Sequence, residues 1–338
     1  MPHIFRLFLG LILLLIGCSA TAAGDPLAAQ REQFIEARKA LKQKQVSRYR
    51  ELAAGLKTYP LYPYLEFDAL RQRLGDASER EVLDFAMRHA DTPLAARLKS
   101  LWLSTLASQR RWDLFLKHYK GSKDTGMQCY ALRARLNTGR KKGLVNDTLK
   151  VWTAGKSLPK ACDPMFDWLY AGNHVSDEHV WERIRLAMGK GQTSLAKYLA
   201  KRLPAKEAEW VSLWRQAHRN PSDTLSNPRL DRDTDIAREI ILHAIRRIAR
   251  SDAASAHTRW ESLKDDYSFT PEQRGVLERY IALSAAQQHR PGAHDLLGAL
   301  PDEQRDAHAR DWQLRAAVTE ADWPALLADI EALPDEER

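Results

Sequence analysis

The chain contains little glycine and few cysteines, and it lacks the common catalytic motifs. Glycine accounts for only 16 of 338 residues, while Ala, Leu, Arg and Glu dominate, as in an all-helical protein. No segment alternates apolar and polar residues for long enough to predict a β-strand. A phosphate-binding loop, a His-Glu-x-x-His motif and a defensible Ser-His-Asp arrangement are all missing from the sequence. We therefore expect a helical protein without a cofactor or a metal site.

Long apolar runs are also missing, except for one short run near the start. Leu7 to Ile16 is too short to span a bilayer, follows the basic Arg6 and precedes small residues through Ala23. This pattern predicts that residues 1–23 are a signal peptide that directs export. A second interpretation is a lipoprotein signal, since Leu-Ile-Gly precedes Cys18, which would be acylated and anchor the chain to the outer membrane. Without that lipid we expect no membrane contact.

Charge is abundant but not concentrated. Charged residues make up 28% of the chain, apolar residues 44%, and the formal net charge is +8 with a pI near 9.3. Lysine and arginine are spread along the chain and do not form one basic tract interleaved with aromatics, so we expect no nucleic-acid binding. A mildly basic surface suits an anionic polymer such as the cell wall, or is an ordinary soluble surface.

Two cysteines, Cys129 and Cys162, remain after the predicted signal. In an oxidising compartment an even pair predicts one disulfide. Their wide spacing, with no adjacent histidine pair, argues against a zinc site.

The remaining sequence predicts helix after helix. The first is a long helix over Leu27 to Lys57. It is followed by predicted helices over the following ranges: Leu65–Leu74, Glu79–His89, Pro93–Ser108, Arg111–His118, Cys129–Leu136, Lys142–Trp152, Val180–Met188 and Ser194–Leu203. Ser78 and Glu81 form a capping-box pattern, and Thr92 stands at an N-cap position. Helix pairs ending in Leu-Pro recur every 33 to 45 residues, which indicates a superhelical solenoid of stacked helical hairpins.

Three glycines and one polar segment mark the breaks between these helices. Gly139, Gly155 and Gly191 can adopt positive φ and so suit helix C-termini. Residues 220–233, with two Asn-Pro steps, favour a bend in the array, with room for a short helix, over a domain boundary. The ten tryptophans mostly occupy apolar helical positions, which favours packing between helices over sugar stacking.

The dipeptide Glu261-Ser262 is a candidate catalytic group. Cleavage of a glycosidic bond needs a carboxylic acid with a raised pKa, and Glu261-Ser262 is a Glu-Ser pair on a predicted helix. It lies among charges in TRWESLKDD, so we interpret Glu261 as a solvated residue and name no catalytic residue. His243 and His257 lie on predicted helices without a spaced partner.

Four segments together resemble the soluble lytic murein transglycosylases of the Gram-negative periplasm. They are YPLYPYLEF (59–67), QCYALRARLNTG (128–139), VWTAGKSLPKACD (151–163) and ERIRLAMGKGQTSLAKYLAKRLP (182–204). In the first, Pro60 and Pro63 disfavour the α conformation at Tyr59 and Tyr62. The resemblance implies a U-shaped or ring-like superhelix over residues 24–338, with Cys129 and Cys162 as its disulfide, and peptidoglycan glycan strands as the partner, together with other cell-wall enzymes.

The same resemblance implies a chemistry and a departure from it. Family enzymes cleave the MurNAc–GlcNAc β-1,4 bond and form a 1,6-anhydromuramic ring, using a glutamate in a lysozyme-like domain. We find none of that domain's motifs in this sequence, so we expect a superhelix that is incomplete at its C-terminal end and inactive alone. The alternative function is a non-catalytic periplasmic scaffold that binds protein or polymer.

Overall fold

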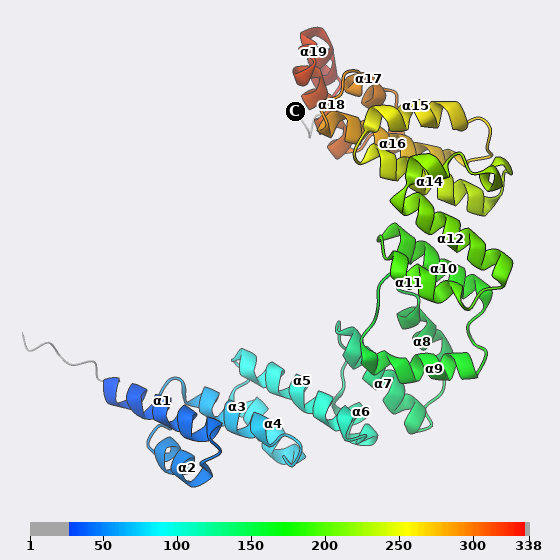
Figure 1. The fold of residues 1–338 in the computed structure, drawn as a ribbon. Helices are drawn as coiled ribbons and strands as arrows, with labels where there is room; N and C mark the ends of the chain where they lie inside the picture. The colour runs from blue at the N-terminus through cyan, green and yellow to red at the C-terminus, as the bar shows by residue number, and fades with distance from the viewer. Residues whose placement is uncertain (1–26, 335–338) are drawn as a thin grey trace, which may run out of the picture. The chain divides into compact units, whose positions relative to one another are not determined.

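The computed structural model describes residues 27–334, and every regular element in this range is a helix (Figure 1). No β-strand occurs in that range, and none of its helices is long and apolar enough to cross a membrane. The predicted all-α array of stacked helical hairpins is therefore confirmed. The predicted signal segment and Cys18 lie outside the described residues.

The chain divides into two compact units. Unit 1 comprises Met1–Lys123 and Arg133–Arg140, and unit 2 comprises Asp124–Leu132 and Lys141–Arg338. Helix α7 (Thr125–Asn137) therefore contributes residues to both.

Unit 1 is built from six short helices and part of α7. The six are α1 (Ala28–Lys42), α2 (Val46–Ala54), α3 (Tyr62–Gln72), α4 (Glu79–Arg88), α5 (Pro93–Ser108) and α6 (Trp112–His118). Its first core cluster joins Phe34 of α1 to the buried Tyr59, whose ring centroids lie 5.4 Å apart. The tyrosine-proline segment thus packs the corner between α2 and α3.

Two predictions about this unit are wrong. The expected long helix from residue 27 to 57 is two helices, because Lys44 adopts a positive φ of 58° and turns α2 back against α1. Tyr62 is helical, as the first residue of α3, although Pro63 follows it. A proline in the first turn removes only an N–H that has no partner within the helix, so the helix tolerates it there.

Local signals elsewhere in unit 1 were accurate. The Ser78 side chain accepts a hydrogen bond from the Glu81 N–H at 3.2 Å, and the Glu81 carboxylate accepts one from the Ser78 N–H at 2.9 Å, so the capping box is confirmed. Helix α5 has the predicted bounds, with Thr92 at its N-cap in an extended conformation.

Unit 2 contains the remaining elements. In chain order these are α8 (Leu144–Trp152), η1 (Lys160–Cys162), α9 (Asp163–Ala171), α10 (Asp177–Gly189), α11 (Thr193–Ala200), α12 (Ala205–Arg219), α13 (Pro221–Thr224), η2 (Pro228–Asp231), α14 (Asp235–Ala249), α15 (Ala253–Leu263), α16 (Pro271–Gln287), α17 (Ala293–Gly298), η3 (Asp302–Gln304), α18 (Ala307–Thr319) and α19 (Trp323–Glu331).

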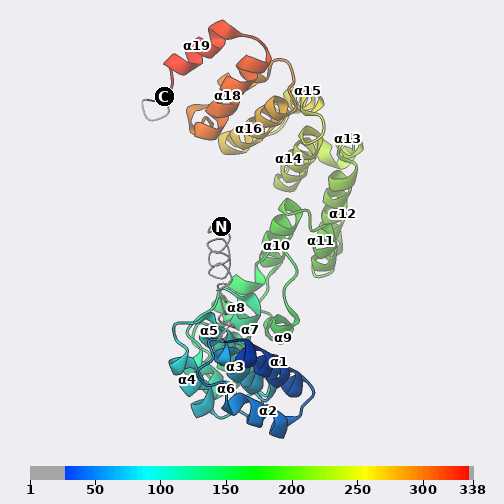
Figure 2. The same cartoon turned by 90° about the vertical axis from the view of Figure 1, so that its left-hand side faces the viewer.

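From α10 onward the hairpins stack as two rows. Helices α10, α12, α14, α16 and α18 contact one another in succession, and each is followed by the shorter helix that completes its hairpin (Figure 1, Figure 2). One core cluster runs from α7 to α16 and includes the fully buried Trp152 and Trp260, and a second cluster packs the helices from α15 to α18. This packing confirms the interpretation of most tryptophans as interhelical, although Trp323 is 57% exposed.

The breaks between hairpins follow the predicted residues with one exception. Gly139 and Gly191 have φ values of +73° and +69°, as helix-ending glycines should. Gly155 has no positive φ; instead an added Cβ would lie 2.4 Å from the Leu186 carbonyl oxygen, so the loop needs glycine for close approach to α10. The predicted bend at 220–233 holds α13 and the 3₁₀ turn η2.

Candidate functional site: a basic pocket on the stacked helices

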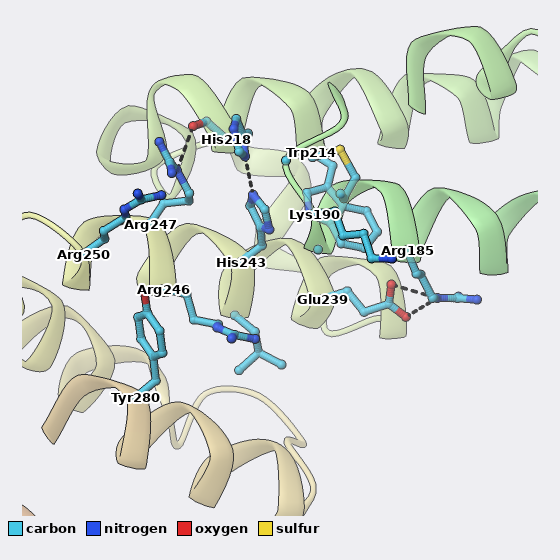
Figure 3. Close-up of a pocket in the computed structure, with 14 residues that line it drawn as sticks. Arg185, Lys190, Trp214, His218, Glu239, His243, Arg246, Arg247, Arg250 and Tyr280 are labelled. Carbon is cyan, nitrogen blue, oxygen red and sulfur yellow. Dashed lines mark hydrogen bonds and ion pairs between the residues drawn. The ribbon is translucent and has the colours of Figure 1, made fainter. Parts of the chain in front are cut away.

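The row of α10, α12, α14 and α16 carries a cavity of about 520 Å³ with an excess of positive charge (Figure 3). We call it the basic pocket. Its polar and aromatic lining residues are Arg185, Lys190, Trp214, His218, Glu239, His243, Arg246, Arg247, Arg250 and Tyr280. Five of these side chains are cations and one is a carboxylate, so a positive potential is focused in the cavity.

The arginines come from the end of one helix. Arg246 and Arg247 occupy the last turn of α14, and Arg250 is its C-cap. Cations are stabilised at this end of a helix by the helix dipole, although Arg246 and Arg250 repel each other across one turn. The Arg246 guanidinium lies over the Tyr280 ring of α16, 4.9 Å from its centroid (Figure 3). Arg247 donates from Nε to the His218 carbonyl oxygen at 3.1 Å, which fixes α14 to α12.

Two histidines form the floor between α12 and α14. His218 Nδ1 and His243 Nε2 are 3.1 Å apart, so one ring donates a hydrogen bond to the other (Figure 3). Burial, followed by His218, Arg247 and Arg246, lowers the pKa of His243 from 6.5 to about 4. Burial and Arg247 also lower the pKa of His218. Both rings are therefore neutral near pH 7, and the positive charge of the pocket is that of its arginines and Lys190.

The single carboxylate of the pocket is already engaged. Glu239 accepts hydrogen bonds from Arg185 Nε at 2.9 and 3.0 Å. Burial raises the pKa of Glu239, and the adjacent Arg185 acts in the opposite direction. With its carboxylate held in this pair, the pocket is equipped to bind anions through N–H donors and an aromatic surface, and not to act as a general acid.

Three comparisons place the chain among known proteins. No protein-family profile matches it. It is 30% identical over 271 residues to the soluble lytic murein transglycosylase of Escherichia coli K12, covering 79% of this chain and 42% of that protein. The soluble lytic murein transglycosylase of Salmonella typhimurium is 30% identical over 284 residues, covering 83% of this chain and 44% of that protein.

Solved structures agree with the sequence matches. An inactive mutant of the lytic transglycosylase Slt from Pseudomonas aeruginosa superposes with a TM-score of 0.79 at 28% identity, covering 90% of this chain and 50% of that one. The chain belongs to the soluble lytic murein transglycosylase family.

The match lies in the helical array of the family. The 70-kDa soluble lytic transglycosylase Slt70 of E. coli superposes with a TM-score of 0.72 at 27% identity, covering 92% of this chain and 51% of that one. The chain spans about half the length of these transglycosylases. A complex of the same 70-kDa enzyme with bulgecin A superposes with a TM-score of 0.65 at 25% identity, covering 91% and 56%.

Of the residues singled out in the sequence, the cysteine pair and Glu261 lie outside the basic pocket, whereas His243 lies in it. Cys129 of α7 and Cys162 of η1 are joined by a disulfide in unit 2, with Cα atoms 4.9 Å apart. Glu261 lies on α15 with a 44% exposed side chain, and its carboxylate is 2.8 Å from Lys264 Nζ. Residues 27–334 hold no group of three or more His, Cys, Asp or Glu arranged to bind a metal.

Sequence reasoning missed the basic pocket because its residues come from four helices. The interpretation of His243 as lacking a spaced partner was wrong, since His218 lies 25 residues earlier, one hairpin back in the stack. Lysine and arginine are spread along the chain, so the sequence did not show that several of them meet in one cavity. The usable signal was the hairpin period itself, which places the first helices of successive pairs side by side.

Proposed function

We propose that this chain is the superhelical, peptidoglycan-embracing part of a lytic murein transglycosylase. The basic pocket would hold anionic groups of peptidoglycan. The observation that carries the proposal is the excess of cations, five against one carboxylate, in one cavity of a chain homologous to murein-cleaving enzymes. Peptidoglycan stem peptides bear carboxylates, and arginines beside an aromatic ring suit carboxylates attached to a sugar-peptide polymer.

The proposal assigns binding, and not bond cleavage, to residues 24–338. A general acid needs an environment that raises its pKa, and burial is the usual cause. Glu261 is exposed and paired with Lys264. Burial does raise the pKa of Glu239, but its carboxylate is held in an ion pair by Arg185 and is not free to donate a proton to a ligand. Cleavage of the MurNAc–GlcNAc bond with formation of the anhydro ring would then depend on a lysozyme-like domain, as the family resemblance implies.

The proposal also places the protein in the periplasm, where peptidoglycan is found. Residues 1–23 would direct export as a cleaved signal peptide, with acylation of Cys18 as the alternative that would anchor the protein to the outer membrane. Mass spectrometry of the N-terminus of the exported protein distinguishes the two. A free N-terminus after residue 22 or 23 supports cleavage, whereas a diacylglyceryl Cys18 supports the anchored form.

Binding is tested with purified residues 24–338 and isolated sacculi. We expect the protein to sediment with sacculi, and Arg246→Ala combined with Arg250→Ala to weaken binding about tenfold, since each lost cation contributes to anion contacts. Lys197→Ala with Lys201→Ala is the matched control, because these exposed lysines hold the equivalent last-turn and C-cap positions of α11. Equal losses in both variants would show that net charge, and not the basic pocket, drives binding.

The absence of cleavage is tested in the same reactions. Soluble products are analysed by liquid chromatography and mass spectrometry for 1,6-anhydromuropeptides. We expect none from the wild-type chain over the time in which a complete transglycosylase digests the sacculi. Release of anhydromuropeptides that persists in a Glu261→Gln variant would overturn the assignment of a purely binding role and would require another acid in the chain.

A further inference from the structure

A second cavity of unit 2 contains a buried arginine that forms no ion pair with any residue of the described range 27–334. The cavity has a volume of about 550 Å³ and lies against α9, α10 and α11. We call it the Arg183 pocket. Its lining includes Ser157, Phe166, Tyr170, Arg183, Ser194 and Tyr198.

Arg183 lies on α10 and is only 5% exposed. Its Nε donates to the Ala154 carbonyl oxygen at 3.2 Å, and its guanidinium lies over the rings of Trp152 and Phe166 at 4.7 and 5.7 Å from their centroids. Among residues 27–334, no carboxylate forms an ion pair with it, and its Nη atoms have no hydrogen-bond acceptor. Burial lowers its pKa, while Tyr170 and Tyr198 act in the opposite direction.

Such an arginine is costly for stability alone. A guanidinium has five N–H donors, of which this one uses a single donor. A buried charge without a partner is destabilising, and an apolar side chain of similar size in its place is often neutral or stabilising. Stacking on two aromatic rings recovers part of that cost. The uncommitted Nη edge, at the wall of a cavity, has the geometry to bind a carboxylate with two parallel hydrogen bonds.

The surroundings hold Arg183 in place before any ligand arrives. Trp152 donates from Nε1 to the Tyr170 hydroxyl at 2.9 Å, which fixes the ring below the guanidinium. Gly155 lets the loop approach α10 closely, since a Cβ there would lie 2.4 Å from the Leu186 carbonyl oxygen, and this approach brings the Ala154 carbonyl to Arg183. A side chain that is already ordered loses little entropy when it binds.

The other groups of the pocket narrow the ligand class. Tyr198 is 54% exposed and offers a flat apolar surface. Asp163 and Asp167 also line the cavity and are exposed. One buried cation and two rim carboxylates fit a ligand that carries both a carboxylate and an ammonium group. The cavity volume lies in the range that accommodates small ligands such as a short peptide.

We propose that the Arg183 pocket binds a short zwitterionic peptide through a carboxylate, and that its natural ligand is the stem peptide of peptidoglycan. Arg183 pairs with a carboxylate of the peptide, Asp163 and Asp167 attract its ammonium group, and the Tyr198 ring packs over the peptide. The identity of the natural ligand rests on the proposed function. The binding chemistry rests on the pocket alone.

The probe is the free tripeptide L-Ala-γ-D-Glu-meso-diaminopimelate, titrated into residues 24–338 by isothermal calorimetry. We expect saturable binding that Arg183→Met weakens at least about thirtyfold, the lower end of the loss when one partner of a buried charge pair is removed. Thermal unfolding of Arg183→Met checks the fold, and we expect a midpoint equal to or above that of the wild type. Tyr198→Ala, at an exposed position, should weaken binding severalfold and provides a second variant if Arg183→Met misfolds.

Arg215→Met is the matched control for Arg183→Met. Arg215 also donates from Nε to a backbone carbonyl, that of Thr193 at 3.0 Å, and lines neither pocket. Its loss should leave tripeptide affinity unchanged. A role for Arg183 in packing alone predicts the opposite result, with a lower unfolding midpoint for Arg183→Met and no effect on binding.

Further measurements separate the sources of binding. A tripeptide with amidated carboxylates should bind much more weakly than the free tripeptide. Sulfate should compete poorly with the tripeptide for the Arg183 pocket. If sulfate competes as well as the tripeptide does, the pocket is a general anion site and the peptide proposal is overturned. Absence of binding at millimolar tripeptide, with sacculus binding intact, would overturn the Arg183 pocket and leave the proposed function standing. Tripeptide binding without sacculus binding would overturn the proposed function and leave the pocket.

Discussion

The two units each carry a cavity lined with arginines, and the charges in these cavities are arranged differently. The unit 1 cavity, about 920 Å³, lies against α1 to α4 and includes Glu66, Arg73, Glu81 and Arg88 among its lining residues. We call it the paired-charge pocket. Glu66 accepts from Arg88 Nη1 at 2.8 Å and also meets His89 Nε2 at 2.8 Å. The smaller basic pocket of unit 2 has five cations and only one carboxylate.

The two cavities differ more in charge balance than in the kinds of residue that line them. In the paired-charge pocket the two acid-base pairs satisfy each other and connect α3 to α4, so they serve the fold. In the basic pocket of unit 2, Lys190, Arg246, Arg247 and Arg250 form no ion pair within residues 27–334, and this excess of cations suits an anionic ligand. Four predictions test this difference, beginning with the largest expected effect.

The disulfide should stabilise unit 2 and not unit 1. Cys129 and Cys162 are both fully buried and close a loop with a sequence separation of 33, which corresponds to about 3–4 kcal/mol in the loop-entropy model. We expect Cys129→Ala with Cys162→Ala to lower the free energy of unfolding of unit 2 by about this amount, as measured by denaturant titration with hydrogen exchange read out by mass spectrometry. Reduced wild-type protein is the control. An equal loss of protection in unit 1 would contradict the assignment.

The two units should respond to acid in different pH ranges. The pKa of His243 falls from 6.5 to about 4 on folding. Because the fold holds His243 in its neutral form, protons bind more tightly to the unfolded state. The free energy of unfolding is therefore highest above the unfolded-state pKa, and it falls by up to about 3 kcal/mol as the pH drops from about 6.5 to 4. In unit 1, hydrogen bonds from Arg73 and Ser78 lower the pKa of Glu81 to about 2, so the corresponding loss begins only below pH 4.5.

A His243→Gln variant tests this sign and this range. Its stability should change less than that of the wild type between pH 6.5 and 4, when unfolding is measured in urea at each pH. Glu81→Gln in unit 1 is the matched comparison and should alter the profile only at lower pH. If the His243→Gln and wild-type profiles have the same shape above pH 4.5, then His243 is not buried in its neutral form, and the description of the pocket floor is wrong.

The sequence predicted well those features that depend on residues close together in the chain. The capping box of Ser78 and Glu81 and the bounds of α5 follow from local hydrogen-bonding chemistry, and the hairpin repeat follows from the spacing of Leu-Pro steps. The turn between α1 and α2 was missed because Lys44 takes up the left-handed conformation that glycine or asparagine normally signals.

Neither the basic pocket nor the Arg183 pocket could be predicted from short segments of the sequence. The basic pocket combines residues from Arg185 to Tyr280, and only the stacking of α10 to α16 brings them together. Arg183 was a different problem: the spacing of Val180, Ile184 and Ala187 places position 183 on the buried face of α10, but an arginine is rarely fully buried and was therefore not expected there. Arg183 and Arg185, two residues apart, lie in separate cavities.

The third prediction compares the two pockets by binding. Arg73→Ala with Arg88→Ala removes two cations from the paired-charge pocket, as Arg246→Ala with Arg250→Ala does from the basic pocket. Because Glu81 and Glu66 already engage the arginines of the first pair, these arginines contribute little to anion binding, and sacculus binding should fall about twofold or less, against about tenfold for the second pair. Sedimentation with sacculi at several salt concentrations measures both, and the basic-pocket variant should also show the shallower salt dependence. Equal losses would remove the distinction between the pockets.

The smallest effect concerns stability, and there the order of the two pockets reverses. Arg88 is 53% exposed and is paired with Glu66, so Arg88→Gln should destabilise unit 1 by about 0.2–1 kcal/mol, the range for exposed ion pairs. Arg250 is exposed, and loss of its favourable position at the end of α14 is offset by relief of repulsion from Arg246. Arg250→Gln should therefore change the stability of unit 2 by less than about 0.5 kcal/mol. Urea unfolding of both variants at neutral pH measures the difference. A larger loss for Arg250→Gln would mean that the cations of the basic pocket stabilise the fold, and the main reason for assigning them to a ligand would disappear.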